Sequence, residues 1–373
     1  MNRIFPIPFY SFCKTVYNNG GLSRSGLLHS FSWLVKTTAS EPFRWIELAL
    51  HNNKIESYQI EQDPIFILGY YRSGTTYFQH LFMQDDRFGY TSLYQTIFPE
   101  LMLTFEKSMT PLLEKIAKIF KSQNHFHRTQ LTWYSPGEED IALMSSLNPD
   151  TAQWGVLFPG NSMKYFQEYT LFETITDVDL NKWKQQYLYL IKKISIANKN
   201  KQLILKSPPN TARIQQLLRM FPNAKFIYIS RHPLDVYSSS KRLWQMIHKR
   251  YMLGKYSPEA IDKIIIETYS QMMDRYIADK NLIPEERLVE VCYEDFIMHP
   301  IEIIEKVYLQ LNLDSFEFCR AAMNEFALAQ KNYQMLNHSL DKIEAGEVQQ
   351  KLSAHIDYWQ TIRHSAQYKK VAI

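Results

Sequence analysis

The fold of this chain is decided by one stretch, Pro64-Ile65-Phe66-Ile67-Leu68-Gly69-Tyr70-Tyr71-Arg72-Ser73-Gly74-Thr75-Thr76-Tyr77-Phe78-Gln79-His80-Leu81-Phe82-Met83. It opens with four apolar residues, Ile65–Leu68, a run too short for a free helix and rich in strand-favouring side chains, which predicts a buried parallel strand. A loop bracketed by Gly69 and Gly74 follows, and apolar residues then recur at helical spacing: Tyr77, Phe78, Leu81 and Phe82. A strand, a glycine loop and a helix in this order form a phosphate cradle, because the loop amides and the positive end of the helix dipole face one anion.

The loop nearly matches the nucleotide-triphosphatase pattern G-x-x-x-x-G-K-[ST], but Thr75 stands where that pattern has a lysine. Because that lysine reaches the outer phosphates of a nucleotide, its replacement favours a shorter anion, such as a 5′-phosphate. Thr76 keeps the hydroxyl position, and the cation has moved into the loop at Arg72, beside Ser73 and ahead of Gly74. A glycine loop alone is a weak signal, but the added cation and hydroxyls make phosphate binding our interpretation.

Two later stretches each end a predicted strand in a cation. Gln202–Lys206 is followed by Ser-Pro-Pro, and Lys225–Ser230 is followed directly by Arg231. Helical periodicity comes after each, as in an open parallel sheet, whose ligands bind at the carboxyl ends of the strands. We therefore expect Arg72, Lys206 and Arg231 to converge on one multiply anionic ligand. The alternative is that each cation only extends its charged end into solvent.

At these residues the sequence resembles a known family. The loop of residues 69–76 is similar to the 5′-phosphosulfate loop of sulfotransferases, whose donor is 3′-phosphoadenosine 5′-phosphosulfate (PAPS). Arg231, with Ser239 eight residues on, resembles their 3′-phosphate site, and Tyr293 begins a Tyr-Glu-Asp run that resembles their element beside the adenosine. The runs Lys-Ser-Pro-Pro and Gly-Glu-Glu-Asp-Ile-Ala-Leu resemble a mainly bacterial branch. The resemblance covers residues 65–311, with its motifs in the family's order.

The resemblance implies a PAPS-dependent enzyme that transfers a sulfuryl group to an acceptor hydroxyl, leaves PAP as product and needs no metal. Residues 73–76 would then bind the 5′-phosphate, with Tyr293 beside the nucleotide. Arg72 and Lys206 would be the catalytic cations, which help by stabilising the charge that grows on the bridging oxygen. Arg231 and Ser239 would hold the 3′-phosphate.

The resemblance leaves the proton acceptor in doubt. Cytosolic relatives carry a histidine two residues after the strand-end lysine, where this chain has Pro208, and many relatives carry one where Asn210 stands. Glu138 leads an acidic run that matches one in the bacterial branch, which makes it our candidate general base. The structural alternative is a helix start in which Ser135 caps the helix, Pro136 occupies the first turn and the acids face the dipole.

The composition excludes several classes of protein. With 42 basic and 38 acidic residues, the net charge of +4 is too balanced for a general nucleic-acid binder. The three cysteines, Cys13, Cys292 and Cys319, lie far apart, which argues against a disulfide framework and fits a reducing cytoplasm. His125 and His127 alternate as metal ligands can, but no further ligands lie near them in the sequence, so we predict no metal site.

We predict an α/β fold in which a P-loop-like parallel sheet is flanked by helices on both faces, in one domain that spans residues 1–373. Residues 61–311 would be the PAPS-binding core, and residues 1–60 and 312–373 would be helical extensions. Apolar spacing predicts two helices between residues 27 and 50, packed on the sheet and followed by a turn at residues 51–54. Residues 331–333 and His338 weakly resemble a loop that folds over the donor in relatives.

The sequence contains no run of eighteen apolar residues, so we predict no transmembrane helix. Prolines interrupt residues 1–10 and no small-residue cleavage site follows, so we predict no signal peptide. This segment either packs on the domain or makes a peripheral contact with a membrane surface.

Two other functions stay open on the sequence. A nucleotide kinase or NTPase would share the strand, loop and helix, but would need a lysine at Thr75 and an acidic magnesium ligand. A non-catalytic nucleotide-binding relative would not need both Arg72 and Lys206. For the enzyme, the aromatic-rich residues 90–120 suggest an apolar small-molecule acceptor, such as a sterol, a lipid or another alcohol.

Overall fold

The computed structural model describes residues 8–119, 132–146, 151–255, 257–330 and 342–368. The chain divides into two compact units, and every strand lies in the second. Unit 1 comprises residues 1–61, 91–200 and 243–261, and unit 2 comprises residues 62–90, 201–242 and 262–373. Both units are made of segments from distant parts of the sequence. That the chain forms a single domain stays a prediction.

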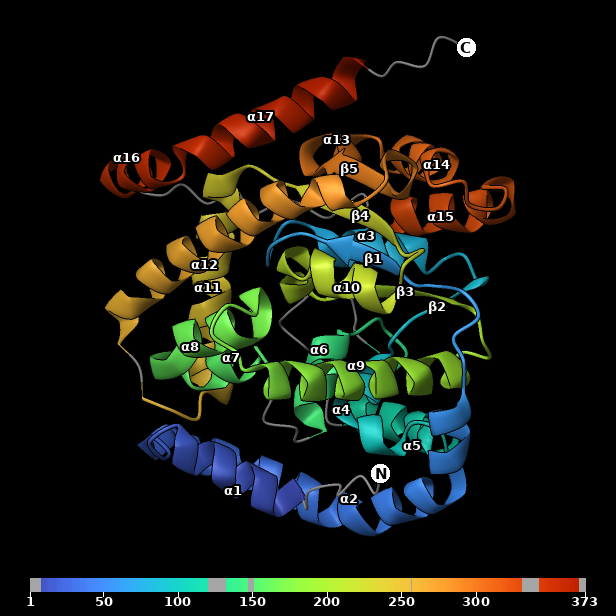
Figure 1. Cartoon of the computed structure of the whole chain (residues 1–373), viewed down its shortest axis with the longest axis vertical. Helices are drawn as coiled ribbons and strands as arrows, with labels where there is room; N and C mark the ends of the chain where they lie inside the picture. The colour runs from blue at the N-terminus through green and yellow to red at the C-terminus, as the bar shows by residue number, and fades with distance from the viewer. Residues whose placement is uncertain (1–7, 120–131, 147–150, 256, 331–341, 369–373) are drawn as a thin grey trace. The chain divides into compact units, whose positions relative to one another are not determined.

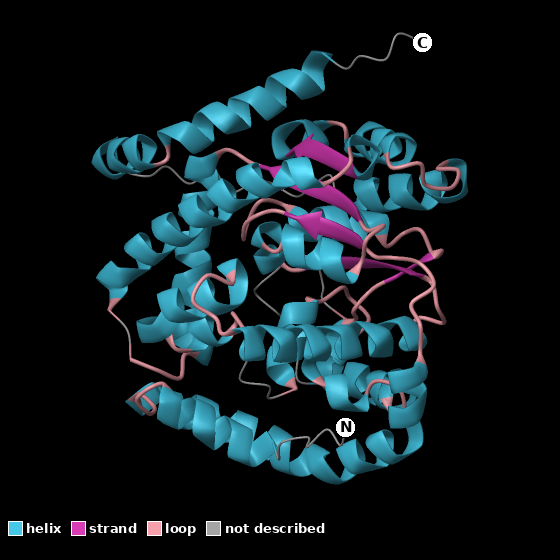
Figure 2. Ribbon diagram, viewed as in Figure 1, coloured by secondary structure: helices cyan, strands magenta, loops and turns pink. Residues whose placement is uncertain are grey.

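Unit 2 is organised around a five-stranded, all-parallel sheet (Figures 1 and 2). Its spatial order is β2-β3-β1-β4-β5, so the strand that leads into the glycine loop is central. The strands are β1 (Ile65–Leu68), β2 (Phe88–Gly89), β3 (Gln202–Lys206), β4 (Lys225–Ser230) and β5 (Leu288–Cys292). The predicted strands at β1, β3 and β4 are therefore confirmed, and β2 and β5 complete the sheet at its two edges.

Helices cover both faces of the sheet, as predicted. Ile65 and Ile67 of β1 point into a core formed with helices that follow the loop and the last strand: α3 (Thr75–Phe82), α13 (Tyr293–Met298), α14 (Pro300–Gln310) and α15 (Glu317–Ala329). On the other face Phe66 stacks on Phe226, and Tyr228 stacks on Tyr276 of α12 (Pro258–Asp279) at 3.8 Å between ring centroids. Figure 1 shows α10 (Ile214–Met220) crossing in front of the strands.

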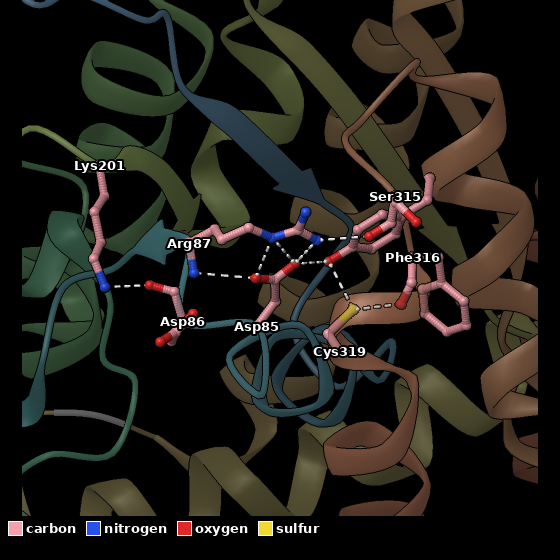
Figure 3. A network of polar contacts seen from close by, with 8 residues as sticks. Asp85, Asp86, Arg87, Lys201, Ser315, Phe316 and Cys319 are labelled. Carbon is pink, nitrogen blue, oxygen red and sulfur yellow. Dashed lines mark hydrogen bonds and ion pairs between the residues drawn. The ribbon is translucent and has the colours of Figure 1, made fainter.

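A buried polar network joins the segment before β2 to α14 and α15 (Figure 3). The Asp85 carboxylate accepts two-pronged hydrogen bonds from the Arg87 guanidinium, and the Tyr308 hydroxyl donates to it at 2.7 Å. Arg87 also donates to the Ser315 carbonyl at 3.0 Å, and the Cys319 thiol lies 3.6 Å from the Tyr308 hydroxyl. Burial alone would raise the pKa of Asp85, but the hydrogen bonds from Arg87 and Tyr308 outweigh it and hold that pKa below its ordinary value.

Three further helices belong to unit 2, two of them wholly and the first only up to Arg242. They are α11 (Pro233–Tyr251), α16 (Lys342–Lys351) and α17 (Ser353–Tyr368). Glu344 of α16 accepts hydrogen bonds from Tyr237 and Lys241 of α11, at 2.8 and 2.6 Å. The C-terminal helices are thus tied to the part of α11 that lies in unit 2.

The described residues of unit 1 are helical. The principal helices are α1 (Pro8–Asn18), α2 (Arg24–Ser57), α4 (Leu93–Ile97), α5 (Glu106–Ile119), α6 (Glu139–Ser145), α7 (Trp154–Leu157), α8 (Ser162–Phe166) and α9 (Asp177–Ala197). Large aromatic residues fill the interior, including Trp154, Trp183 and Tyr187, all fully buried. No helix among the described residues of the whole chain is both long and apolar enough to cross a membrane.

The prediction for the N-terminal helices was wrong in two respects. Residues 24–57 form the single 34-residue helix α2, which also contains the turn that was expected at residues 51–54. Most of the apolar residues that were expected to pack, such as Leu28, Phe31 and Leu50, are exposed instead. The buried positions of α2 carry small, polar or charged residues at six of seven sites: Gly26, Ser30, Thr37, Ser40, Arg44, Glu47 and Ile55.

The alternative of a helix start near Ser135 was right about the acids, since Glu139 and Asp140 lie in the first turn of α6, but wrong about the cap, since α6 begins at Glu139. The Ser135 carbonyl instead accepts from the Leu93 amide at 2.8 Å, and Pro136 forms a bridge with Ser92. Gly137 packs so closely on α4 that a Cβ there would lie 2.0 Å from the Thr96 hydroxyl oxygen. These contacts hold residues 135–137 in an extended path, and the helix forms only after it.

Candidate functional site

The glycine loop after β1 has a tight backbone. The Gly69 amide donates to the Thr211 hydroxyl at 2.8 Å, and the Ser73 amide donates to the Tyr70 carbonyl at 3.1 Å. Arg72 and Gly74 have φ angles of 70° and 95°, in the left-handed region. For Arg72, which has a Cβ, this conformation costs about 1–2 kcal/mol, so the surrounding contacts must hold the loop in place.

Tyr293 lies directly on this loop. It begins α13, immediately after β5, and its ring is buried. A Cβ added to Gly74 would lie 2.2 Å from the ring, which leaves no room for any side chain at this position. The loop and the Tyr-Glu-Asp run are therefore in contact although more than two hundred residues separate them.

Arg231 joins the same contact from the end of β4. Its Nη1 donates to the Arg72 carbonyl at 3.0 Å, and its guanidinium lies over the Tyr293 ring at 4.7 Å from the centroid. Nη2 stands 4.0 Å from the exposed carboxylate of Asp235. Its Nε is buried and has no hydrogen-bond partner among the described residues. A buried donor without a partner is costly, and a bound anion would remove that cost.

Ser239 lies on the same side of the loop, on α11. Its buried hydroxyl accepts from Arg72 Nε at 3.0 Å. The sequence paired Ser239 with Arg231, but the hydrogen bond that the structure shows is with Arg72. Because Arg231 in turn binds the Arg72 backbone, all three residues belong to one cluster.

Arg242 is a fourth cation, which the sequence analysis missed. Burial lowers its pKa, and the positive charges of Arg72 and Arg231 lower it further. The signal was available, because Arg242 lies three residues after Ser239 and side chains at that spacing share a helix face. The three positively charged guanidinium groups repel one another. An anion bound among them would offset this repulsion.

Lys206 reaches the helix side of the loop. It is the buried last residue of β3, and its Nζ donates to the Thr76 hydroxyl at 3.5 Å. Thr75 is the first residue of α3 and is also buried. Since β1 pairs with both β3 and β4, the ends of these three strands are adjacent. The predicted convergence of Arg72, Lys206 and Arg231 around the loop is confirmed.

Two further polar groups near Lys206 were missed from the sequence. Burial lowers the pKa of His80, one turn after Thr76 on α3, to about 4, and the charge of Lys206 adds to this effect. Nε2 of His80 and both side-chain polar atoms of Gln79 are buried without a hydrogen-bond partner within the described ranges. His80 therefore stays neutral at neutral pH.

A single carboxylate connects the ends of β4 and β5. Glu294 accepts from the His232 amide at 3.0 Å, from the Cys292 thiol at 3.1 Å and from Trp359 Nε1 of α17 at 3.1 Å. The second residue of the Tyr-Glu-Asp run thus fixes the chain on both sides of the Arg231–Tyr293 contact.

Glu138 lies in unit 1, unlike the loop cluster. It is the residue before α6, in an extended conformation, and its side chain makes no capping hydrogen bond. Glu139 and Asp140 are fully buried, whereas Glu138 is partly exposed. Tyr187 donates to Glu139 at 3.3 Å, and Thr151 donates to Asp140 at 3.3 Å. Of the three acids Glu138 is the one that solvent reaches, and its role stays a prediction.

Some of the predicted residues fall outside the described ranges. These are His125 and His127, and the C-terminal residues 331–333 and His338. Among the residues that are described, no three His, Cys, Asp or Glu side chains are grouped as a metal ion would need. Cys13, Cys292 and Cys319 are free cysteines, the last two of them buried.

Taken together, the loop amides, the hydroxyls and the cations form a site for an anion with more than one charged group. Arg231 and Arg242 lie with Arg72 and Ser239 on one side, and Lys206 lies with Thr76 on the helix side. Charge on both sides of the loop can bind a nucleotide with phosphate groups at two positions.

Comparison with known proteins agrees with this geometry. The model of the sulfotransferase family matches residues 64–317. The chain is 26% identical, over 82% of its length and 77% of the relative's, to omega-hydroxy-beta-dihydromenaquinone-9 sulfotransferase Stf3 of Mycobacterium bovis.

Two solved structures share the fold. Sulfotransferase STF9 from Mycobacterium avium superposes with a TM-score of 0.70 at 16% identity, covering 96% of this chain and 97% of that one. Sulfotransferase STF1 from Mycobacterium tuberculosis gives 0.66 at 15% identity, with 93% and 91% covered. The family match includes β1, β3, β4 and β5 and all four cations of the cluster, and it decides against a nucleotide kinase. This chain belongs to the sulfotransferase family.

Proposed function

We propose that this enzyme uses PAPS as its donor and transfers the sulfuryl group to a hydroxyl of an apolar alcohol, in particular a lipid. The observation that carries the proposal is the contact of Arg231 with both Tyr293 and the Arg72 carbonyl, with Lys206 at Thr76 on the other side of the same loop. This arrangement offers separate positive groups to the two phosphorylated positions of the donor.

The residues of the loop fit the 5′ end of such a donor. Gly74 has no room for a side chain, so its backbone stays open to a ligand. This backbone and the start of α3 would bind the 5′-phosphate, together with Ser73, Thr75 and Thr76. Arg72 and Lys206 would stabilise the charge that develops on the oxygen left with the nucleotide. PAPS supplies the sulfuryl group, and PAP is the product.

The opposite side of the loop fits the 3′-phosphate. Arg231 has a buried Nε without a partner in the described structure. Its positive charge lowers the pKa of Arg242, which therefore lies near it. Ser239 would orient Arg72 between the two phosphate groups. Tyr293, held between Gly74 and Arg231, would lie beside the nucleotide.

The acceptor hydroxyl must lose its proton when its oxygen bonds to sulfur. We assign this proton to Glu138, the partly exposed carboxylate among three consecutive acids. A lipid alcohol as acceptor is supported by the 26% identical relative, whose name gives a hydroxylated dihydromenaquinone as its acceptor. The aromatic residues that precede α5 in the sequence, Tyr90, Tyr94, Phe98 and Phe105, favour an apolar acceptor.

The test is transfer of label from ³⁵S-PAPS to lipid and polar fractions of a bacterial extract, with a hydroxylated isoprenoid quinone as a defined acceptor. We expect labelled product in the lipid fraction and about 10²–10³-fold slower labelling with Lys206→Ala. Arg231→Ala should weaken PAP binding, whereas Arg219→Ala, an exposed arginine of α10, should leave it unchanged. Label confined to polar products would overturn the lipid assignment, and unchanged PAP affinity in Arg231→Ala would overturn the 3′-phosphate site.

A further inference from the structure

Helix α2 has its polarity reversed relative to an ordinary surface helix. A helix on a water-facing surface buries its apolar stripe and exposes polar residues. In α2 the buried residues include Ser30, Thr37, Arg44 and Glu47, and the last of these is paired with Lys193 of α9 at 2.7 Å. The exposed side carries large apolar residues instead. Exposure of this side of the helix to water is therefore energetically unfavourable.

The exposed apolar residues form a stripe that the exposed Thr38 interrupts between Val35 and Pro42. They follow one another at intervals of one, three, four or seven residues, which places them on one broad face of the helix: Leu28, Phe31, Val35, Pro42, Trp45, Ile46, Ala49 and Leu50. From Leu28 to Leu50 the stripe is about 33 Å long at 1.5 Å per residue. Leu28 is 80% exposed, Phe31 68% and Leu50 64%.

Residues 9–50, which include nearly all of α1 and most of α2, contain half of the large apolar side chains that are exposed in the described residues. Of 22 large apolar side chains that are exposed in the described residues, eleven lie between residues 9 and 50. Helix α1 adds Phe9, Tyr10 and Tyr17 to those of α2. Exposed apolar patches of this extent mark binding surfaces in soluble proteins.

The exposed charges on this surface are mostly positive. Lys14, Arg24 and Lys54 are exposed, and the one exposed acid among the described residues of α1 and α2 is Glu56, in the last turn of α2. The other two acids of these helices, Glu41 and Glu47, are paired with Arg44 and Lys193. A surface with apolar and aromatic residues, three exposed cations and a single exposed anion at the end of α2 complements the anionic surface of a lipid bilayer.

We propose that α1 and α2 form a membrane-docking surface that lies in the interface of an anionic bilayer, with the stripe of α2 among the acyl chains. The helix would lie along the membrane plane and would not cross it. The docking surface goes beyond the proposed function, because it binds the bilayer itself and not the acceptor alcohol.

The experiment measures sedimentation of the full-length protein with vesicles, without donor or acceptor. The vesicles contain phosphatidylcholine, either pure or mixed with phosphatidylglycerol. We expect the protein to pellet with the mixed vesicles. Leu28→Gln, Phe31→Gln and Leu50→Gln combined should abolish this, at roughly tenfold weaker binding for each side chain removed from lipid. The matched control combines Met298→Gln, Leu309→Gln and Leu328→Gln, equally exposed residues of unit 2, and should bind as the wild type does.

Two further measurements separate the sources of binding. Lys14→Ala with Lys54→Ala should weaken binding to the mixed vesicles by about fivefold for each cation and should not change binding to pure phosphatidylcholine. Brominated lipids should quench tryptophan fluorescence in the wild type and much less in Trp45→Phe, which keeps the apolar stripe.

Three outcomes would overturn the proposal: no pelleting of the wild type, equal loss in the control variant, or unchanged vesicle binding in the α2 variant. If ultracentrifugation also shows a dimer that only the α2 variant disrupts, the stripe is an interface between copies of this chain. Because the vesicle assay contains no PAPS, its failure would leave the proposed reaction intact, and failed lipid sulfation would leave vesicle binding intact.

Discussion

Unit 2 contains two groups of buried or half-buried arginine side chains, and they differ in the partners that the fold supplies. Arg87 faces the Asp85 carboxylate with Nε and Nη2 of its guanidinium, the Tyr308 hydroxyl donates to the same carboxylate, and Nη2 also donates to the Ser315 carbonyl (Figure 3). Arg231 donates to a neutral carbonyl and keeps a buried Nε without a partner among the described residues. It also shares its surroundings with the positive charges of Arg72 and Arg242.

The difference separates a group that stabilises the fold from one that is suited to a ligand. In the Arg87 group the charges are balanced, so folding alone recovers the cost of burying them. In the Arg231 group three like charges lie together, and the carboxylate beside them, that of Asp235, is exposed and stands 4.0 Å from Arg231 Nη2, so an anion from outside is needed for balance. We expect mutations in the first group to change stability and mutations in the second to change donor binding or turnover.

The largest expected effect lies outside both groups, at Glu138. If Glu138 accepts the proton, Glu138→Gln should lower turnover by about 10²–10⁴-fold while PAP affinity stays at the wild-type value. The measurement is kcat from labelled transfer together with calorimetric PAP binding. Full activity would remove Glu138 from this role, and weakened PAP binding would show that the substitution acts on donor binding and not on proton transfer alone.

Lys206→Ala should lower kcat by about 10²–10³-fold, since Lys206 is the cation on the helix side of the loop. PAP lacks the sulfuryl group, so its affinity should fall much less. Lys201→Ala is the matched control, because Lys201 is an exposed lysine that donates to the Asp86 carbonyl at the start of the same strand. Equal losses in the two variants would mean that the effect is structural.

Asp85→Ala should lower the free energy of unfolding by about 3 kcal/mol, because it leaves Arg87 and the buried Tyr308 hydroxyl without their acceptor. PAP affinity should not change below the melting transition. Urea denaturation measures the effect, with Asp86→Ala, the exposed neighbouring carboxylate, as the control. A change in PAP affinity without a change in stability would contradict the division into two groups.

His80 makes the stability of unit 2 depend on pH. Its pKa is about 4 in the folded protein against 6.5 in the unfolded chain, so the unfolded chain binds the extra proton first as the pH falls. The free energy of unfolding should therefore drop by about 2 kcal/mol from pH 7 to pH 5. His80→Gln should lose this part of the pH dependence, and an unchanged slope in that variant would assign it to other groups, such as His248.

The smallest effect is expected for Arg242→Ala, since in the described structure Arg242 is linked to the cluster only through the charges of Arg72 and Arg231. PAP affinity should fall by about tenfold, the weight of one charge-assisted hydrogen bond. The PAP-free protein should be as stable as the wild type or slightly more stable, because one of three like charges is gone. A loss of stability would show that Arg242 has an acidic partner and belongs with the balanced group.

The sequence predicted the part of the fold that local patterns determine. Ile65–Leu68 is apolar on both faces and must be a central strand, and the cations that end β3 and β4 had to lie beside it. The contact of Tyr293 with Gly74 could not be derived, because it depends on the packing of β5 against β4. Arg242 was within reach of helical spacing, but many exposed arginines have the same spacing to a polar residue.

The wrong predictions concern α2 and the start of α6, where the sequence pattern indicated a helix but not what packs against it. The spacing of apolar residues in α2 was recognised, but spacing alone does not tell which side of a helix is buried. The stripe was assigned to the interior because water was assumed outside. The break that was expected within residues 24–57 did not occur, although Pro42 lies inside the helix. At Ser135 the capping pattern was outweighed by the close packing of Gly137 on α4.

The hydrogen bonds made by α16 and α17 set a lower limit on the length of a working enzyme. The family match ends at residue 317, and every residue proposed to touch the donor precedes it. Yet Glu344 anchors the helix that carries Ser239 and Arg242, and Trp359 completes the shell around Glu294. A chain truncated after α15 would keep all of its donor ligands and still bind the nucleotide less tightly, because α11 and Glu294 would lose the contacts that α16 and α17 supply.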